Sequence, residues 1–402
     1  MTSAAHLFPR QFPGFPRNLP QFPLCTSGVS TVSDPNIAGA APARSYPCQA
    51  CGATLEYAPG TRMMRCPYCR HEQPIAHAGR EVREHDYAEL AQLPIKPRRL
   101  AGTLHVFVCP GCHARTESDT LSEKCQFCGT PLVAEAGATE RIVPEAMVPF
   151  GIDRNGARDA LRRWTSSRWF APSSLKKVTE AETFKGSYLP YWTYDADTVS
   201  DYTGQRGDYY WETETYTVTE NGQTRTETRQ VRKTRWRHAS GTVSRFFDDV
   251  LVAGTSRVAA RQLDKLTPWP LERVIPYQEE YLAGFQTVRY DIEPESGLEL
   301  AKQKMAEVIE DDCRHDIGGD EQRVSWVDTR YFDLTFKLVL LPVWFLTYLH
   351  GGKTLQVMVN AHTGEVIGQR PYSAIKITAA VLAALAVIAI IAVIILKAQS
   401  GG

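Results

Sequence analysis

The chain has 402 residues, of which 43% are hydrophobic and 22% are charged, so it is long enough to bury a core in more than one folded unit. Its 45 basic and 45 acidic residues cancel. That balance excludes the strong overall field that draws a protein to nucleic acid or to an acidic membrane.

The N-terminal segment 1–44 is rich in proline and phenylalanine, with Phe-Pro dipeptides at Phe8, Phe12, Phe15 and Phe22. Proline removes backbone donors that a helix needs, and this composition is typical of chain that cannot form a packed core. We expect a disordered tail, with an interaction peptide as the alternative. The same prolines interrupt any apolar run that a secretory signal would require.

Eight of the ten cysteines form four CxxC pairs, and Cys25 and Cys313 stand alone. Two CxxC pairs separated by a short hairpin bring four thiolates around one tetrahedral Zn²⁺. The spacing predicts two structural zinc ions, one in a zinc ribbon at 45–75 and one in a second ribbon at 107–135. The predicted ligands are Cys48, Cys51, Cys66 and Cys69 for the first ion, and Cys109, Cys112, Cys125 and Cys128 for the second. Such a regular pattern favours a compartment where thiols stay reduced, the cytoplasm.

Alternatives to structural zinc are an iron–sulfur cluster or a redox-active CxxC pair, but no pair lies in the βαβ context of a thioredoxin-type motif. His71 and His113 are adjacent to ligands, yet four cysteines already complete each site. Gly52 and Gly129 follow their knuckles, where positive φ is useful, whereas Arg70 and His113 take the corresponding places in the other two. We expect those two turns to be less ideal.

The two ribbons are joined by a linker at 76–106, in which Gly79 to Leu93 suits a short helix before Pro94. The segment 45–135 contains ten basic and ten acidic residues. This balance is unfavourable for binding phosphates, so we expect the ribbons to contact protein.

A β-rich α+β domain is predicted over 136–373. It should begin with a strand and a capped helix that carries Ala157, Leu161 and Trp164 on one side. Further on, Asn221-Gly222 is a two-residue hairpin turn, which places Glu214 opposite Arg229 and Thr215 opposite Thr228.

A second helix is predicted over 297–315, with one face that carries Leu298, Ala301, Met305 and Val308. Two strand segments share a Leu-Pro-x-Trp sequence, at 189–192 and 341–344. The shared tetrapeptide suggests a duplicated β unit.

The strand Arg225 to His238 is rich in basic residues. Its candidate contact residues for anionic lipid or nucleic acid are Arg225, Arg229, Arg232, Lys233, Arg235 and Arg237. The alternative, which we favour, is a solvated hairpin strand whose charges face Glu212 and Glu214.

No catalytic constellation is recognisable in the sequence. The segment HGGKT at 350–354 lacks the first glycine of a phosphate loop, because Thr347 stands in its place. Glu310, Asp311, Asp312 and His315 cluster in the second helix, where solvation of a helix end is the favoured interpretation over metal binding. We therefore expect no enzymatic activity.

The C-terminal segment Ile377 to Leu396 has twenty residues without a charge, between Lys376 and Lys397. At about 1.5 Å per residue it would cross about 30 Å, the hydrocarbon thickness of a bilayer. We predict a transmembrane helix over 375–397 and a short tail over 398–402. A single-pass anchor of this kind leaves the N-terminal bulk of the chain in the cytoplasm.

Several of these segments resemble a group of bacterial tail-anchored double zinc-ribbon proteins that are often labelled primosomal helicase-like. The similarity rests on the two four-cysteine ribbons, the late apolar helix, VPEAMVPF (143–150), KGSYLPYWTYDADT (185–198) and LPVW (341–344). The chain lacks a Walker A loop and a helicase core, so the label implies no ATPase here. The resemblance implies membrane assemblies with SPFH (flotillin-like), phage-shock-type or TPM-domain proteins.

Together these features predict an α+β protein with two small zinc ribbons, a β-rich middle domain with a few helices and one C-terminal transmembrane helix. The favoured function is a membrane-tethered adaptor or scaffold that binds protein partners. The alternative is a nucleic-acid-binding protein at the membrane.

Overall fold

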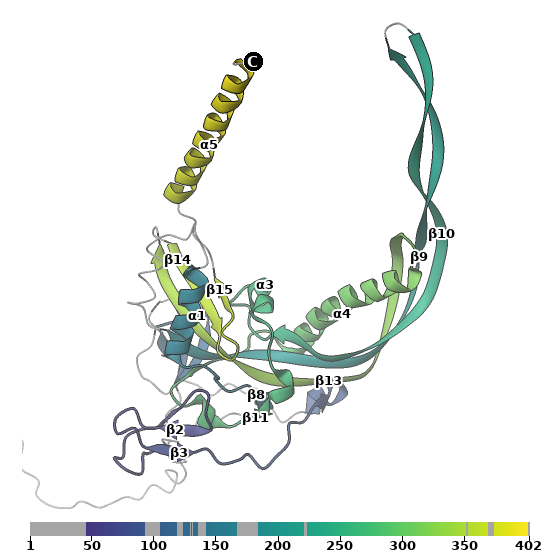
Figure 1. Ribbon diagram of the computed structural model, residues 1–402. Helices are drawn as coiled ribbons and strands as arrows, with labels where there is room; N and C mark the ends of the chain where they lie inside the picture. The colour runs from purple at the N-terminus through teal and green to yellow at the C-terminus, as the bar shows by residue number, and fades with distance from the viewer. Residues whose placement is uncertain are drawn as a thin grey trace, which may run out of the picture. The chain divides into compact units, whose positions relative to one another are not determined.

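The computed structural model describes residues 46–92, 105–118, 124–128, 130, 132–135, 142–166, 184–220, 223–350, 353–368 and 374–400. The predicted tail at 1–44 and the Asn221-Gly222 turn lie outside these residues. Figure 1 shows a β-rich body with a few helices, as the sequence predicts. The domain boundaries drawn from the sequence stay predictions.

The N-terminal third consists of short elements that belong to the two cysteine-rich segments and their link. They are β1 (Glu56–Tyr57), β2 (Met63–Arg65), β3 (Glu72–Pro74), β4 (His85–Asp86), the 3-10 helix η2 (Tyr87–Gln92), β5 (His105–Val108), β6 (Arg115–Ser118) and β7 (Val133–Glu135). Strands β1, β2 and β3 form a three-stranded sheet of their own.

The rest of the chain contains the long elements. In order they are β8 (Ala146–Met147), α1 (Arg154–Ser166), β9 (Lys185–Glu220), β10 (Gln223–Ala253), α3 (Ala260–Leu263), η3 (Asp264–Leu266), η4 (Leu271–Arg273), β11 (Ile275–Pro276), η5 (Glu279–Leu282), β12 (Gln286–Val288), α4 (Pro294–Ile317), β13 (Glu321–His350), β14 (Lys353–Asn360), β15 (Val366–Gly368) and α5 (Ala374–Ser400).

Strands β9 and β13 pair antiparallel over most of their length and form the centre of a twelve-stranded sheet. The two Leu-Pro-x-Trp segments lie opposite each other, with Leu189 paired to Leu341. Every residue from 187 to 196 in β9 is buried, because side chains on both faces of the strand are covered. The repeated motif thus marks the most enclosed part of the sheet.

Strand β12 joins β9 to the second cysteine-rich segment. It runs parallel to β9 at Ser187 and Tyr188, and antiparallel to β6, which continues into β5 and β7. The strands that flank the second set of cysteines are therefore part of the central sheet.

Irregularities in two strands bend the sheet near its middle. The register shifts between Phe247 and Val250 in β10 and between Phe332 and Thr335 in β13. Asp249 and Asp333 have positive φ of 52° and 47° there, a conformation that aspartate tolerates better than most residues. Extra residues of this kind turn a strand and redirect its side chains.

Helix α4 covers one face of β9, β10 and β13, as Figure 1 shows. Its buried side recurs every three or four residues, at Leu298, Ala301, Met305, Ile309, Cys313 and Ile317. Val308 is 40% exposed, so the prediction that it belongs to this face is wrong. Ile309 takes the place instead, because the spacing of four residues from Met305 keeps it on the sheet side.

The predicted first helix is confirmed as α1. The Asp153 carboxylate accepts a hydrogen bond of 2.8 Å from the Gly156 backbone N–H, which caps the helix, and Ala157 and Leu161 are buried.

The predicted helix at 79–93 is largely wrong. His85 and Asp86 form strand β4, which pairs with Phe336 and Thr335 of β13, and only the following six residues adopt a 3-10 helix. The Tyr87 ring also packs edge-on against Phe336, with 5.8 Å between centroids. Pairing with β13 overrides the local helical tendency.

Beyond β13, strands β9 and β10 continue as a two-stranded arm (Figure 1). Strand β13 begins at Glu321, opposite Gly207, so residues 208–220 of β9 have β10 as their strand partner. The predicted register is confirmed, since Glu214 pairs with Arg229 and Thr215 with Thr228.

Helix α5 closes the described chain, and its described large aliphatic side chains are exposed. Within the described part of the chain, no helix has the length and apolar character needed to cross a membrane.

Candidate metal centres

The first cysteine-rich segment folds into two knuckles that face each other. The Gly52 N–H donates to the Cys48 carbonyl at 2.8 Å, and the Arg70 N–H donates to the Cys66 carbonyl at 3.0 Å. Each bond closes a tight turn around one CxxC pair. Strands β1 and β2 form the hairpin that brings the two turns together.

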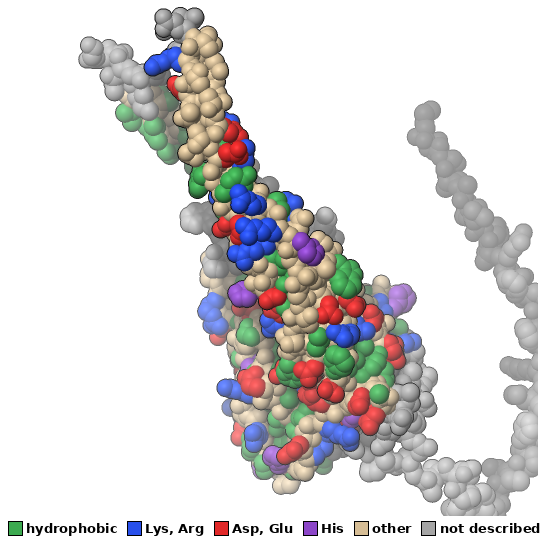
Figure 2. Space-filling model, turned by 90° about the vertical axis from the view of Figure 1, so that its right-hand side faces the viewer, with side chains coloured by type: hydrophobic (Ala, Val, Ile, Leu, Met, Phe, Trp, Pro, Cys, Tyr) green, Lys and Arg blue, Asp and Glu red, His purple; other side chains and the backbone are tan. Residues whose placement is uncertain are grey.

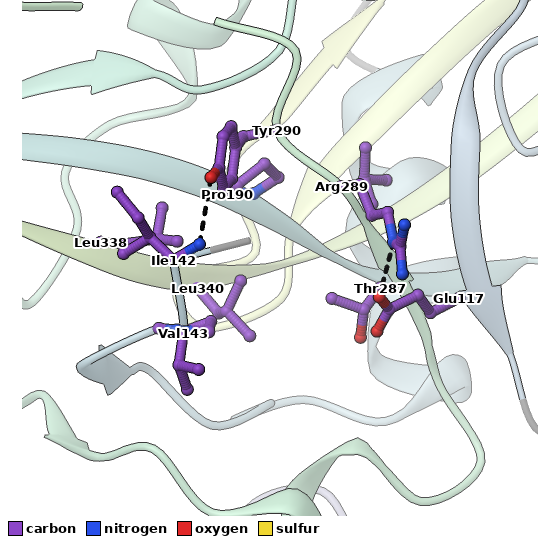
Figure 3. Close-up of a pocket in the computed structure, with 11 residues that line it drawn as sticks. Glu117, Ile142, Val143, Pro190, Thr287, Arg289, Tyr290, Leu338 and Leu340 are labelled. Carbon is purple, nitrogen blue, oxygen red and sulfur yellow. Dashed lines mark hydrogen bonds and ion pairs between the residues drawn. The ribbon is translucent and has the colours of Figure 1, made fainter. Parts of the chain in front are cut away.

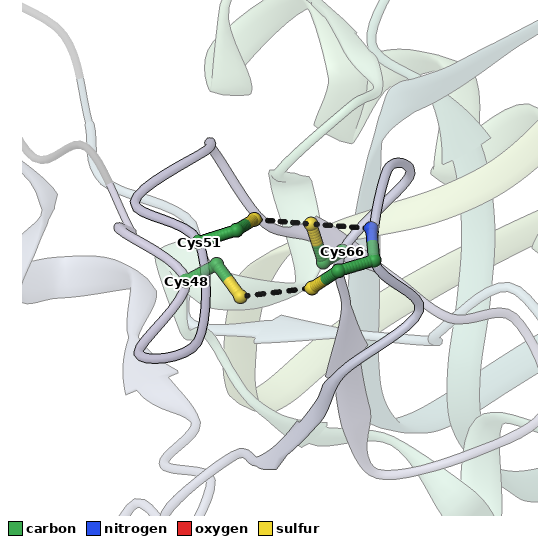
Figure 4. Close-up of side chains that lie close together, drawn as sticks. Cys48, Cys51 and Cys66 are labelled. Atoms are coloured by element: carbon green, nitrogen blue, oxygen red, sulfur yellow. Dashed lines mark hydrogen bonds between the residues drawn. The ribbon is translucent and has the colours of Figure 1, made fainter.

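The four sulfurs of this first cluster converge, and their distances fit a metal ion. Cys48 Sγ lies 3.5 Å from Cys69 Sγ, and Cys51 Sγ lies 3.5 Å from Cys66 Sγ (Figure 4). A disulfide would require about 2.05 Å. Four sulfurs at about 2.3 Å from a tetrahedral zinc ion would be about 3.8 Å apart. The cluster is therefore slightly more compact than a loaded zinc site and is compatible with one.

The second cluster repeats this arrangement. Cys109 Sγ lies 3.4 Å from Cys128 Sγ and Cys112 Sγ lies 3.6 Å from Cys125 Sγ. In both clusters the first cysteine of each pair is buried and the second is nearer the solvent. The structure thus assembles all eight predicted ligands into two groups of four, compatible with two bound metal ions.

Two knuckles have a non-glycine residue where the backbone turns left-handed. Arg70 has a φ of 60° and His113 a φ of 57°, while Gly52 has a φ of 75° in the equivalent position. The prediction that the Arg70 and His113 turns are less ideal is confirmed. Side chains other than glycine have a free-energy cost in this region, and four metal–sulfur bonds would offset it.

Neighbouring groups lower the pKa of one thiol in each cluster, Cys66 in the first and Cys128 in the second. The Cys69 N–H donates to Cys66 Sγ and, with the Tyr68 N–H, lowers the pKa of Cys66 to about 6. Burial opposes ionisation of Cys128, but the hydroxyl and N–H of Thr130 outweigh it and lower the pKa of that thiol to about 7. Metal ions bind thiolates, so each site presents an ionised ligand near neutral pH.

Both clusters are fixed to the body of the protein. In the first, the Tyr57 hydroxyl donates to the Phe150 carbonyl at 3.1 Å, and its ring packs on Tyr281 with centroids 4.9 Å apart. In the second, Phe127 packs edge-on against Phe345 of β13, with centroids 5.4 Å apart. The candidate metal sites are therefore parts of the hydrophobic core and not independent units joined by a linker.

A third group of possible ligands is formed by Glu84, Asp195 and Asp249, whose carboxylate oxygens lie within 4.8 Å of one another. The ammonium of Lys337, itself buried, donates to Glu84 Oε1 and Asp249 Oδ1 at 2.5 Å each. The lysine provides the positive charge that a metal ion would otherwise supply. This group is an ion cluster that links the residue before β4 to β9, β10 and β13.

Crowding in the ion cluster shifts its acid groups in opposite directions. Burial and the neighbouring Glu84 raise the pKa of Asp195 to about 7. Hydrogen bonds from Asp195 and Lys337 lower the pKa of Glu84 to about 2. Asp195 therefore keeps its proton to higher pH than an ordinary carboxyl group, whereas Glu84 is ionised. The four residues come from separate parts of the sequence, which is why no local motif revealed them.

A small apolar pocket lies between β9, β12, β13 and the segment before β8 (Figure 3). Leu338, Leu340 and Pro190 line one side, and the buried pair of Arg289 and Glu117 lies at the edge, with 2.7 Å between Nε and Oε1. These two charges bind each other at the edge of the pocket.

The basic side chains of the predicted contact surface lie on both faces of β10. Arg229 is 3.1 Å from Glu214, and Lys233 is 2.7 Å from Glu212 and 3.1 Å from Glu214. Arg232 points to the opposite face, where it stacks on Tyr209 at 4.1 Å from the ring centroid. Carboxylates thus match Arg229 and Lys233, and an aromatic ring matches Arg232.

The acidic residues near the end of α4 also bind arginines. Arg314 bonds Glu310 and Asp311, and Arg245 of β10 bonds Asp312.

Comparison with known proteins gives one distant relative. The chain is 23% identical over 249 residues to the uncharacterised protein YdjG of Bacillus subtilis (strain 168), a match that spans 59% of this chain and 67% of that protein. No protein-family description matches the chain, and no solved structure does. The resemblance to tail-anchored zinc-ribbon proteins therefore stays a prediction.

Replacing one ligand in each cluster tests the metal sites separately. We expect Cys66→Ser and Cys125→Ser each to reduce the bound metal from two ions per chain to one, because the four thiols of each cluster form one site. Elemental analysis of the purified full-length chain measures this, and Cys25→Ser, outside all CxxC pairs, is the control. Retention of both ions in either ligand variant would contradict the assignment.

The proton held by Asp195 makes stability depend on pH. The folded-state pKa of about 7 exceeds the ordinary 3.8, so between these values the native state keeps a proton that the unfolded chain has lost. The resulting contribution is complete below about pH 4 and is lost as pH rises through 7, on the order of 2–4 kcal/mol. Glu84, with its lowered pKa, changes protonation only at lower pH.

We therefore expect Asp195→Asn, which stays neutral, to lose this fall in the free energy of unfolding between pH 5 and 8. Urea unfolding of the metal-loaded chain across that range measures it, with the exposed Asp197→Asn as control. Parallel pH profiles for wild type and Asp195→Asn would show that the pKa of Asp195 is not raised in the folded chain.

Proposed function

We propose that this chain is a zinc-ribbon adaptor held at a membrane, which binds protein partners and catalyses no reaction. The observation that carries the proposal is the pair of four-thiol clusters, each complete and each fixed to the core. A metal with four protein ligands has no position left for a substrate. Its effect is to hold a small surface rigidly.

Zinc is the metal that this donor set favours. Four cysteine sulfurs in a compact tetrahedral group are typical of structural zinc, while iron–sulfur clusters share the same ligands but need room for inorganic sulfide. Sulfurs 3.4–3.6 Å apart suit a single ion between them. We infer two zinc ions with a structural role.

The first ribbon presents an aromatic side chain that suits protein recognition. Tyr68 lies between Cys66 and Cys69, in the second knuckle, and is 81% exposed. Tyrosine is enriched among the residues that dominate binding energy at protein interfaces. The knuckle fixes its backbone, so little conformational freedom is lost when a partner binds.

Nucleic acid is the less favoured partner. Arg229 and Lys233 of β10 bond carboxylates on β9, and over 45–135 the ten basic residues are balanced by ten acidic ones. Binding to nucleic acid gains free energy when unpaired cations of the protein neutralise phosphates and so release the counterions of the nucleic acid. The family resemblance points to SPFH (flotillin-like), phage-shock-type or TPM-domain proteins as partners.

Membrane attachment is supported by the apolar run Ile377 to Leu396. Helix α5 spans this run, and its described large side chains, from Val381 to Ile394, are exposed aliphatic groups. The side chains of α5 are described at 378–394 and 397. The continuous described stretch is therefore shorter at both ends than the predicted span. An exposed aliphatic surface of this kind is stable in lipid or against a partner.

Partner capture tests the adaptor directly. The full-length chain is crosslinked in native membranes and purified in detergent, and bound proteins are quantified by mass spectrometry. We expect Tyr68→Ala to keep both metal ions but to reduce the captured partner about five- to thirtyfold, the effect of losing 1–2 kcal/mol of binding energy. Phe246→Ala, an exposed aromatic on the sheet, is the control. Equal capture by both variants, or recovery chiefly of nucleic acid, would contradict the adaptor.

The anchor has its own test. We expect the full-length chain to stay in the membrane fraction after washes with high salt and with carbonate, because apolar burial in lipid is insensitive to charge screening. A chain that ends at Ser373 should be released. Release of the full-length chain by either wash, or retention of the truncated one, would show that α5 is not the anchor.

A further inference from the structure

The arm formed by β9 and β10 has two open backbone edges. Among the described strands, β10 pairs with β9 alone, and β9 beyond Gly207 pairs with β10 alone. The Tyr209 N–H, which points away from β10, donates to the Asp320 side chain at 2.6 Å. Outward groups alternate along a strand, so the N–H groups of 211, 213, 215 and 217 also point outward.

The two strands of the arm carry opposite charge. Residues 208–219 of β9 include three acidic residues, Asp208, Glu212 and Glu214, and no basic one. Residues 224–237 of β10 include six basic residues and one acidic residue, Glu227. One open edge of the arm is therefore acidic and the other is basic.

The two faces of the arm also differ. One face is uncharged toward the tip and consists of Thr213, Thr215, Thr217, Thr219, Thr224, Thr226, Thr228 and Gln230. Gln230 Nε2 donates to Thr213 Oγ1 at 2.8 Å on this face. The other face carries the ion pairs of Glu212 and Glu214. In Figure 2 the upper part of the arm is mostly tan, the colour of uncharged polar side chains and backbone.

We propose that the acidic β9 edge of one copy of this chain pairs with the basic β10 edge of a second copy, so that copies line up side by side through their arms. With the arms pointing the same way, β9 and the neighbour's β10 run antiparallel. Because the outward groups come from odd residues of β9 and even residues of β10, threonine faces meet threonine faces and acidic residues meet basic ones.

Charge decides against the symmetric alternatives. Pairing β9 with its own copy would bring Glu212 and Glu214 close to the same residues, and pairing β10 with its own copy would oppose two strands that each have five excess positive charges. Pairing of unlike edges leaves one edge of each kind free at the ends of the row, so assembly continues beyond a pair. This arrangement deepens the proposed adaptor function, because a row of copies multiplies the partner sites.

Two proline variants test the pairing. Thr215→Pro removes an outward N–H from β9, and Thr228→Pro removes one from β10, while the bonds within the arm are kept. The full-length chain in detergent is studied by sedimentation velocity at low salt. We expect wild type to form species larger than a dimer, and each variant alone to be monomeric. A mixture of the two should give dimers, because each variant keeps the edge that the other has lost.

The outcomes separate the pairing modes. Dimers of either variant alone would show pairing of like edges and overturn the proposal, as would a wild-type chain that is monomeric at low salt. If the prolines disrupt the arm itself, the charge variants Glu212→Lys with Glu214→Lys and Arg229→Glu with Lys233→Glu replace them. Each should be monomeric alone and should assemble when mixed with the other, and failure to do so would also overturn the proposal. Loss of assembly with intact partner capture would leave the adaptor function standing.

Discussion

The antiparallel pairing of β9 with β13 is the contact on which the other parts of the molecule depend. It encloses a strand segment that is buried on both faces, from Ser187 to Ala196. Buried strand backbone must form its hydrogen bonds within the sheet, so this pair fixes the register of its neighbours. The second cluster reaches it through β12, and helix α4 packs across it.

Contact with this sheet distinguishes the two four-cysteine clusters from independent zinc ribbons. The buried cysteines of both clusters belong to the same hydrophobic cores as residues of β9 and β13. Metal loss should therefore loosen the core as well as the knuckles, since burial and metal–sulfur bonds are coupled in the folded state. A rigid mount of this kind suits recognition of a partner better than it suits turnover of a substrate.

Sequence spacing predicted the features that depend on neighbours along the chain. The eight ligands, the Asp153 cap of α1 and the pairing of Glu214 with Arg229 each follow from a fixed number of residues between partners. Spacing along the chain did not predict the long-range contacts. The 79–93 helix gave way to pairing with β13, and the cluster around Lys337 joins residues more than 250 positions apart. Val308 was misplaced by one residue, the usual limit of a 3.6-residue period.

The arm and the ion cluster show how charge is used at different depths. Lys337 is buried and its carboxylate partners satisfy it directly, whereas the charges of the arm are exposed and divided between two strands. Exposed pairs contribute little to stability individually. Their arrangement is better suited to select a neighbour than to hold the fold.

The most direct test of the account is X-ray absorption spectroscopy at the zinc edge on the purified full-length chain. Closed structural sites predict four sulfur neighbours at about 2.3 Å around each metal ion and no lighter ligand. A nitrogen or oxygen neighbour, or fewer than four sulfurs, would reveal an open coordination position. That result would contradict a purely structural role for the metal and would favour catalysis over binding.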